Sequence, residues 1–116
     1  MALDSVNNMY VTNDGSIEGG SDSITIYQHG TTGDVTPKQV ISGSNTQLNL
    51  PQGIAVDSGG YIFVVNDGSA NGGVDTITVY LTGYSGNTPP IATISGSLTG
   101  LEQPAGIAVA PSLTTW

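Results

Sequence analysis

Hydrophobic positions fall in short runs separated by turns rich in glycine, asparagine and aspartate. Residues 53–56 are apolar and end in Asp57-Ser58-Gly59-Gly60, a cluster typical of a hairpin turn. Residues 61–65 are aromatic and β-branched, which suits a strand buried on both faces. Residues 76–80 alternate apolar and polar side chains, and residues 90–94 form a weaker run that starts with proline, as an edge strand does. The pattern predicts one four-stranded antiparallel sheet.

The same pattern occurs twice along the chain. A shift of 53 positions aligns the sequence with itself without a gap and gives roughly 28 identities in about 63 pairs. Two unrelated hairpins of similar composition would not keep this register. The repeat predicts strands at 8–12, 23–27 and 38–42, a first strand cut short at Ala2 to Asp4, and a fresh copy of that first strand at 101–110.

Two motifs carry a resemblance to known repeats. Residues 10–13 read Tyr-Val-Thr-Asn, and residues 51–57 follow a proline, glycine, aliphatic and aspartate order. The chain thereby resembles the NHL and YVTN families of β-propeller repeats, although its loop between the second and third strands is longer and it lacks the basic residues of RNA-binding members. The resemblance implies an all-β fold of two four-stranded antiparallel β-propeller blades. These families include lectin-like scaffolds, lactonases, extracellular bacterial surface proteins and protein-binding modules, so the resemblance leaves function open.

We expect the two blades to assemble with further copies of the chain. The expected divisions are residues 1–53 for the first blade, 54–105 for the second, and 106–116 for an extra first strand donated to a neighbouring protomer. Because about three or more repeats are usually needed to bury the apolar faces of such units, two blades are too few. We expect a homotrimer with six blades, ahead of a homotetramer with eight, and an open fibre is the alternative outcome. The expected interface residues are Gly106, Ile107, Ala108, Val109, Tyr10 and Val11.

Composition narrows the partners. The 116 residues contain one lysine, no arginine and nine acidic residues, for a formal net charge of -8. Such a surface repels phosphate backbones, which argues against nucleic acid as a partner. Cysteine is absent, which excludes disulfides and thiolate sites, and no long apolar run indicates a membrane span or signal peptide. The neutral polar surface favours, by analogy, an extracellular location or the cell surface of a bacterium.

The repeated glycine-rich loops at 13–22 and 66–75 hold most of the candidate ligands. Oxygen ligands at spacings of about four, with glycines between them, fit a calcium site. Asparagine, aspartate and glycine also form turns by bonding their own backbone, and this second interpretation is favoured because the spacing is not that of an EF-hand and Glu18 is replaced by Asn71. The candidate calcium ligands are Asp14, Glu18, Asp22, Asp67 and Asp75, and the candidate ligand-binding residues are Asn13, Asp14, Asn66, Asp67 and Gln52.

No catalytic constellation stands out. His29 is unmatched in the second repeat and has neither a second histidine nor a cysteine beside it, so we expect an exposed loop residue. Tyr27 and Tyr80 repeat at the end of a strand, where packing between sheets is favoured over stacking on a sugar, and Tyr84 and Trp116 are the less constrained aromatic platforms. We therefore expect a non-enzymatic scaffold that is structural or binds a ligand such as a glycan. The alternative is a lactonase-like metal-dependent hydrolase site at the mouth of the ring.

Overall fold

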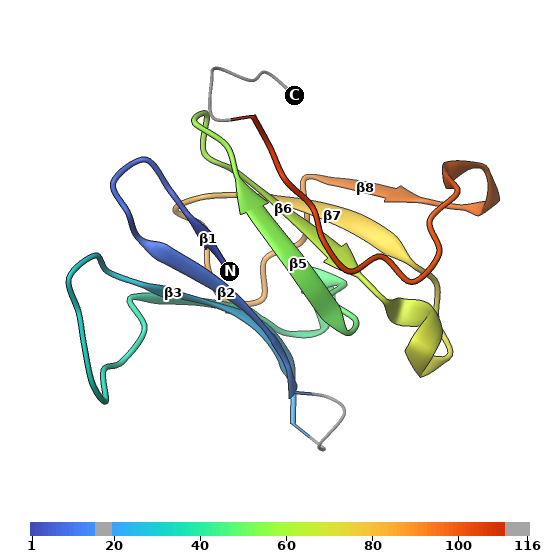
Figure 1. The fold of residues 1–116 in the computed structure, drawn as a ribbon. Coiled ribbons are helices and arrows are strands. Elements are labelled where there is room, and N and C mark those ends of the chain that lie inside the picture. The colour runs from blue at the N-terminus through green and yellow to red at the C-terminus, as the bar shows by residue number, and fades with distance from the viewer. Residues whose placement is uncertain (16–19, 111–116) are drawn as a thin grey trace.

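The chain folds into two antiparallel sheets of four strands each, with the strands of each sheet in sequence order. The computed structural model describes residues 1–15 and 20–110 (Figure 1). The all-β prediction is confirmed at this level. Sheet 1 comprises β1 (Ala2–Leu3), β2 (Met9–Asp14), β3 (Asp22–Tyr27) and β4 (Gln39–Ser42). Sheet 2 comprises β5 (Pro51–Val56), β6 (Tyr61–Asn66), β7 (Thr76–Leu81) and β8 (Ala92–Ser95).

The strand registers of the two sheets repeat with the period of the sequence. Met9 lies opposite Tyr27 in sheet 1, and Ile62 lies opposite Tyr80 in sheet 2. Short 3-10 turns follow the last strand of each sheet at Ser44–Thr46 (η2) and Ser97–Thr99 (η4). A third such turn, η3 (Gly68–Asn71), lies between β6 and β7. Each repeat therefore folds as one sheet.

Several strand boundaries differ by one or two residues from those expected, among them the starts of β5 and β8. β5 begins at Pro51, so sheet 2 takes in residues 51–53, which the sequence assigns to the first unit. β8 begins at Ala92 instead of Pro90, because proline has no N–H for the ladder; the first backbone bond to β7 comes from the N–H of Ile91 to the carbonyl of Val79, at 2.7 Å.

The hydrophobic core lies where the sheets meet. Alternation along β2 and β3 turns one set of apolar side chains toward sheet 2, and alternation along β6 turns a second set toward sheet 1. As predicted, β6 is buried on both faces. The contributing side chains are Tyr10, Ile24, Ile26 and Ile41 from sheet 1 and Ile54, Ile62, Val64 and Tyr80 from sheet 2.

The segment 101–110 is extended but carries no strand ladder in the part that the structure describes. It runs alongside β5 (red in Figure 1) and comes closest where a Cβ added to Gly53 would lie 2.8 Å from the Cα of Gly106. Only glycine at position 53 allows this approach. Among the described residues, no helix is long and apolar enough to cross a membrane.

Candidate functional site

The aspartates at the ends of the two acidic loops each accept a backbone N–H from the turn that leads into the next repeat. The carboxylate of Asp22 accepts the N–H of Leu50 at 2.9 Å, and that of Asp75 accepts the N–H of Gln103 at 2.7 Å. Both donors adopt positive φ angles, 52° at Leu50 and 48° at Gln103, which β-carbon-bearing residues rarely do. The bond from Gln103, with those from Ser69, holds the pKa of Asp75 below its usual value. Each aspartate therefore fixes the turn that leads into the following repeat.

The loops themselves close on their own backbone. The N–H of Gly73 bonds the carbonyl of Gly68 at 2.9 Å, and the equivalent bond joins Gly20 to Gly15 at the same length. A Cβ on Gly68 would collide with the carbonyl of Val74. The glycines of the second loop therefore lie in a tight turn, as the turn interpretation of the sequence expects.

The calcium interpretation gains no support from the geometry. Ca²⁺ requires six to eight oxygen ligands, whereas the described residues hold no group of three or more acidic or histidine side chains suited to a metal. Glu18 lies outside the described residues. One oxygen of Asp14 accepts the Nε2–H of Gln52 at 3.3 Å, and the other is buried with no hydrogen-bond partner among the described residues. This single atom does not make a cation site.

Gln52 reaches Asp14 because a register shift between Pro51 and Gly53 leaves it unpaired in the ladder. Its carbonyl also accepts the hydroxyl of Thr12 at 3.3 Å. The contacts of Gln52 with Asp14 and Thr12 therefore join β5 of sheet 2 to β2 of sheet 1.

The side chains of Asn66 and Asn13 each bond the neighbouring strand of their own sheet. Asn66 is 0% exposed, its amide group donates to the hydroxyls of Thr76 and Thr78, and its side-chain oxygen accepts the N–H of Asn49 at 3.2 Å. Asn13 makes the equivalent pair of donations within β3. At Asp67, the N–H bonds the carbonyl of Leu50 at 3.0 Å. These positions hold the sheets together and leave little of Asn66 for a ligand.

Polar contacts between the sheets were not foreseen from the sequence. The hydroxyl of Tyr80, whose side chain is 1% exposed, donates to the carbonyl of Thr46 in η2 at 2.7 Å. Burial raises the pKa of Tyr80 to about 12. At the outer edge of sheet 1, Ile41 forms a bridge with Gly86 from the loop after β7. The sequence feature that could have indicated these contacts is that Thr46 and Gly86 are each identical to the residue 53 positions away, Thr99 and Gly33.

The turn before β2 is held by one carboxylate. Asp4 accepts the N–H groups of Val6 and Asn8 at 3.0 and 2.9 Å, and the hydroxyl of Tyr10 at 3.1 Å. Burial raises the pKa of Asp4, but these hydrogen bonds outweigh it and the net pKa lies below the ordinary value. Burial and the Asp4 carboxylate raise the pKa of Tyr10 to about 12. Asp57 accepts N–H groups in the same way in sheet 2, at the hairpin turn expected there.

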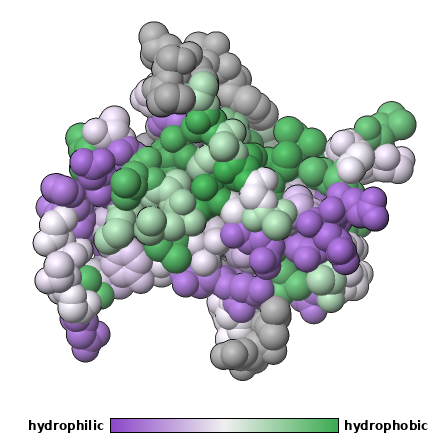
Figure 2. All heavy atoms as spheres, in the orientation of Figure 1, coloured by the Kyte–Doolittle hydropathy of each residue, from purple (hydrophilic) through white to green (hydrophobic). Residues whose placement is uncertain are grey.

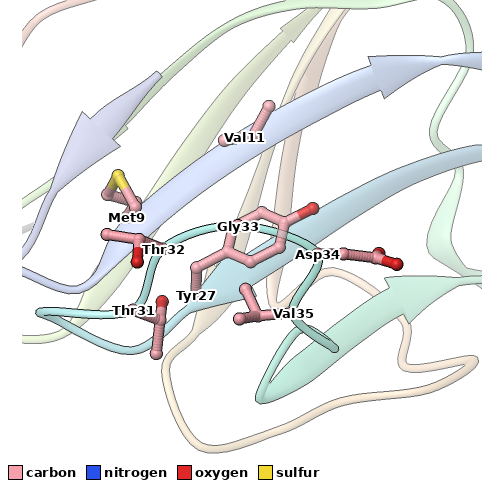
Figure 3. Close-up of a pocket in the computed structure, with 8 residues that line it drawn as sticks. All are labelled: Met9, Val11, Tyr27, Thr31, Thr32, Gly33, Asp34 and Val35. Atoms are coloured by element: carbon pink, nitrogen blue, oxygen red, sulfur yellow. The ribbon is translucent and has the colours of Figure 1, made fainter.

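The outer face of sheet 1 is hollowed. Met9, Val11 and Tyr27, from β2 and β3, line a cavity of about 360 Å³ together with the loop residues 31–35 (Figure 3). These three side chains are the counterparts, 53 positions earlier, of Ile62, Val64 and Tyr80, which are buried between the sheets.

The outer face of sheet 2 is the counterpart of the inner face of sheet 1. Alternation places four of its side chains opposite the core, and Ile94 among them is 38% exposed. These residues are Phe63, Ile77, Val79 and Ile94, which correspond to Tyr10, Ile24, Ile26 and Ile41. Of these four side chains, Phe63 and Val79 are themselves buried, at 8% and 0% exposure, so the outer face of sheet 2 is apolar in composition but only partly open.

A second hollow is lined by three residues that occupy the same position in successive repeats. Leu3, Val56 and Val109, spaced by 53 positions, line a cavity of about 300 Å³ with their neighbours. Hydrophobic residues gather on the side of the molecule where β1, β5 and the C-terminal segment lie (Figure 2). The segment 101–110 therefore lies beside β5 in the same way that β5 lies beside β1.

The remaining candidates are isolated. His29 is exposed, and its N–H bonds the side chain of Asn8 at 3.1 Å. Tyr84 is exposed beside a hollow of about 230 Å³, and Trp116 lies outside the described residues. Neither a comparison with protein-family models nor a search of curated proteins found a match to this sequence.

Proposed function

We propose that the chain is a non-enzymatic β-propeller repeat unit, similar to NHL and YVTN repeats, that assembles with copies of itself into a ring and serves as a structural or ligand-binding scaffold. One observation carries the proposal. The two outer sheet faces correspond, residue for residue, to the two faces that pack together inside the chain.

The apolar faces supply the driving force. Inside the chain, Ile24 and Ile26 of sheet 1 pack in one cluster with Ile62 of sheet 2, and all three are at most 2% exposed. On the outside, the same types of side chain stand at the same positions, and burying them against another copy removes apolar surface from water. The parts of these faces that a second copy can still cover are Ile94, at 38% exposure, and the half-buried Met9, Val11 and Tyr27.

The polar contacts have counterparts as well. The bond from Tyr80 to the carbonyl of Thr46 corresponds to a bond from Tyr27 of one copy to Thr99 of the next. The bridge of Ile41 with Gly86 corresponds to one between Ile94 and Gly33, and Gly33 lines the hollow on the outer face of sheet 1. Both contacts would join the outer face of sheet 1 in one copy to the outer face of sheet 2 in its neighbour.

Such a contact is heterologous, because one face meets a different face. Heterologous contacts close into rings or continue as fibres. Two sheets per copy give even blade numbers, and within the usual range of about four to eight blades we expect three copies and six blades, with four copies as the second choice.

The test is the mass of the 116-residue chain in solution, measured by light scattering after size exclusion at micromolar concentration. We expect a trimer. The substitution Val11→Asp places a charge on the outer face of sheet 1 and should give a folded monomer, whereas Val74→Asp, at a loop residue that is 65% exposed, should leave the mass unchanged. A parent chain that stays monomeric and folded refutes the proposal, and filaments in electron micrographs would replace the ring by the fibre.

Within this scaffold the ligand class that fits best is a neutral glycan. With nine acidic residues against one lysine, the chain attracts neither phosphate backbones nor acidic polymers. A glycan screen on the assembled protein tests this, and binding to DNA or RNA that weakens with added salt would contradict it.

A further inference from the structure

The innermost strand of sheet 1 is shorter than its counterpart in sheet 2. β1 pairs only Ala2 with Tyr10 and Leu3 with Met9. β5 also covers the next three residues of β6, at Val64, Val65 and Asn66. The equivalent stretch of β2, residues 11–13, has no β1 partner along this edge in the described chain. An uncovered strand edge is a template for pairing with another strand.

The C-terminal segment has the sequence that this edge matches. Residues 104–109 are identical to β5 except that Ala105 replaces Gln52. The segment is already extended and lies beside β5, held by the bond from Gln103 to Asp75 and by the close approach of Gly106 to Gly53. Between residues 104 and 110 it forms no ladder in the part that the structure describes.

The receiving strand belongs to another copy. Within one chain, β5 packs against β1 and β2 on one side, and segment 104–109 is the next repeat of the same strand. We propose that residues 104–109 of one copy pair with β2 of the neighbouring copy and complete its first sheet. This rests on the proposed function, because it requires that the outer faces of two copies meet.

The register follows from the pairing of β5 with β6. Ile54 lies opposite Val64 and Gly53 opposite Val65, so Ile107 lies opposite Val11 of the neighbour and Gly106 opposite its Thr12. Pro104 takes the place of Pro51, at the strand start, where the missing N–H is tolerated.

This register brings the donated strand into competition with β1. Ala108 and Val109 fall opposite Tyr10 and Met9, the two positions that Ala2 and Leu3 already occupy. The donated segment offers pairing at five positions, as β5 does, against two for β1. Leu3 is also 49% exposed and contributes little packing. The donated strand therefore displaces Ala2 and Leu3.

The turn that follows stays with the receiving copy. Asp4 is bonded to Val6, Asn8 and Tyr10, so the turn is fixed to β2 whether or not β1 is present. In the donated segment the corresponding position is Ala110, which has no carboxylate. The completed strand thus ends at Val109 of the donor, and the hairpin turn begins at Asp4 of the receiver.

The absence of native cysteine makes a direct test of the register feasible. One chain carries Ile107→Cys and a second carries Val11→Cys; the two are mixed, oxidised and resolved on non-reducing gels. Side chains directly opposite lie at disulfide distance, whereas diagonal neighbours do not. We expect a mixed disulfide that forms at least about tenfold faster than the out-of-register control, Val109→Cys with Val11→Cys.

The outcomes separate this inference from the proposed function. Equal rates for the two pairs, or no mixed disulfide in a sample whose mass is still that of an oligomer, overturn strand donation and leave assembly through the faces intact. A monomeric mass with no disulfide overturns both.

The competition has its own measurement. Deleting Ala2 and Leu3 removes the competing strand, so the concentration at which half of the chains are assembled should fall about tenfold. Unchanged or weaker assembly, in a variant whose circular dichroism matches the parent, overturns displacement of β1.

Discussion

Tyr80 offers the sharpest test of how the two sheets are joined. Its hydroxyl donates to the carbonyl of Thr46 at 2.7 Å and accepts the hydroxyl of Thr78 at 3.0 Å, and all three residues are at most 1% exposed. The substitution Tyr80→Phe keeps the ring and removes the donor. Because a buried acceptor then loses its partner, the free energy of unfolding should fall by about 1–3 kcal/mol.

The melting temperature translates this loss into a measurement. For 116 residues, an unfolding entropy of about 2.1 cal/mol/K per residue gives about 0.24 kcal/mol/K, so the expected decrease is about 4–12 °C. Thermal unfolding followed by circular dichroism or calorimetry, at a dilution where the chain is monomeric, provides the assay.

Tyr27 is the matched control. It occupies the same strand position one repeat earlier, on the outer face of sheet 1, where it lines the open cavity (Figure 3). Tyr27→Phe should lower the melting temperature of the isolated chain by less than about 2 °C, as exposed substitutions do. Equal decreases for the two variants, or no decrease for Tyr80→Phe, would refute the reasoning that this hydroxyl ties the sheets together.

Three further predictions concern pH, packing and metal. Burial raises the pKa of Tyr80 to about 12 in the fold, so the stability that this residue contributes is complete below pH 10 and is lost as the pH rises through about 12. The pKa of Asp75 is lowered, so the stability that Asp75 contributes is lost as the pH falls below 3.8. Melting temperatures measured across the pH range that show neither decline would contradict these assignments. Gly53→Ala places a Cβ 2.8 Å from Gly106 and should destabilise the fold by about 1–3 kcal/mol in denaturant titrations, whereas Gly59→Ala, with nothing nearer than 3.4 Å, should cost less. A chelator should leave the melting temperature unchanged, and a rise on adding calcium would restore the calcium hypothesis for the acidic loops.

The sequence predicted the strands well because the signals for them are local. Alternation and the hairpin turns placed the strand at Tyr61 within one residue of its observed end at Asn66. The 53-residue period then transferred the same assignment to sheet 1, where β3 ends at Tyr27 as expected. Local chemistry also identified Asp57 as a turn residue, since its partners are two and four positions away.

The roles of the loop aspartates were harder to predict because their partners are distant in the sequence. Asp22 and Asp75 each accept an N–H group 28 positions further on. The donors, Leu50 and Gln103, share no side-chain identity, so the repeat alone does not mark them. A carboxylate in a glycine-rich loop fits calcium and backbone capping equally well by composition, and only the geometry separates the two.

The contact that Gln52 makes between the two sheets was not predicted from the sequence. The sequence grouped it with the acidic loops as a ligand-binding residue, whereas its side chain reaches Asp14 of the other sheet at 3.3 Å through a ladder irregularity. No sequence pattern predicts this irregularity, because it depends on how β5 pairs with β6.

The difference between the two outer faces argues for a directional assembly. A twofold dimer would bring a face against itself, pairing Tyr27 with Tyr27 or Ile94 with Ile94, and neither pairing has a precedent inside the chain. Pairing unlike faces instead repeats an interface that the chain already forms, with its apolar cluster and its bond from Tyr80 to Thr46. Each added copy then continues the rotation that relates sheet 1 to sheet 2. In the proposed assembly, the angle between the two sheets, and not the strength of the contact, therefore sets the number of copies needed to close a ring.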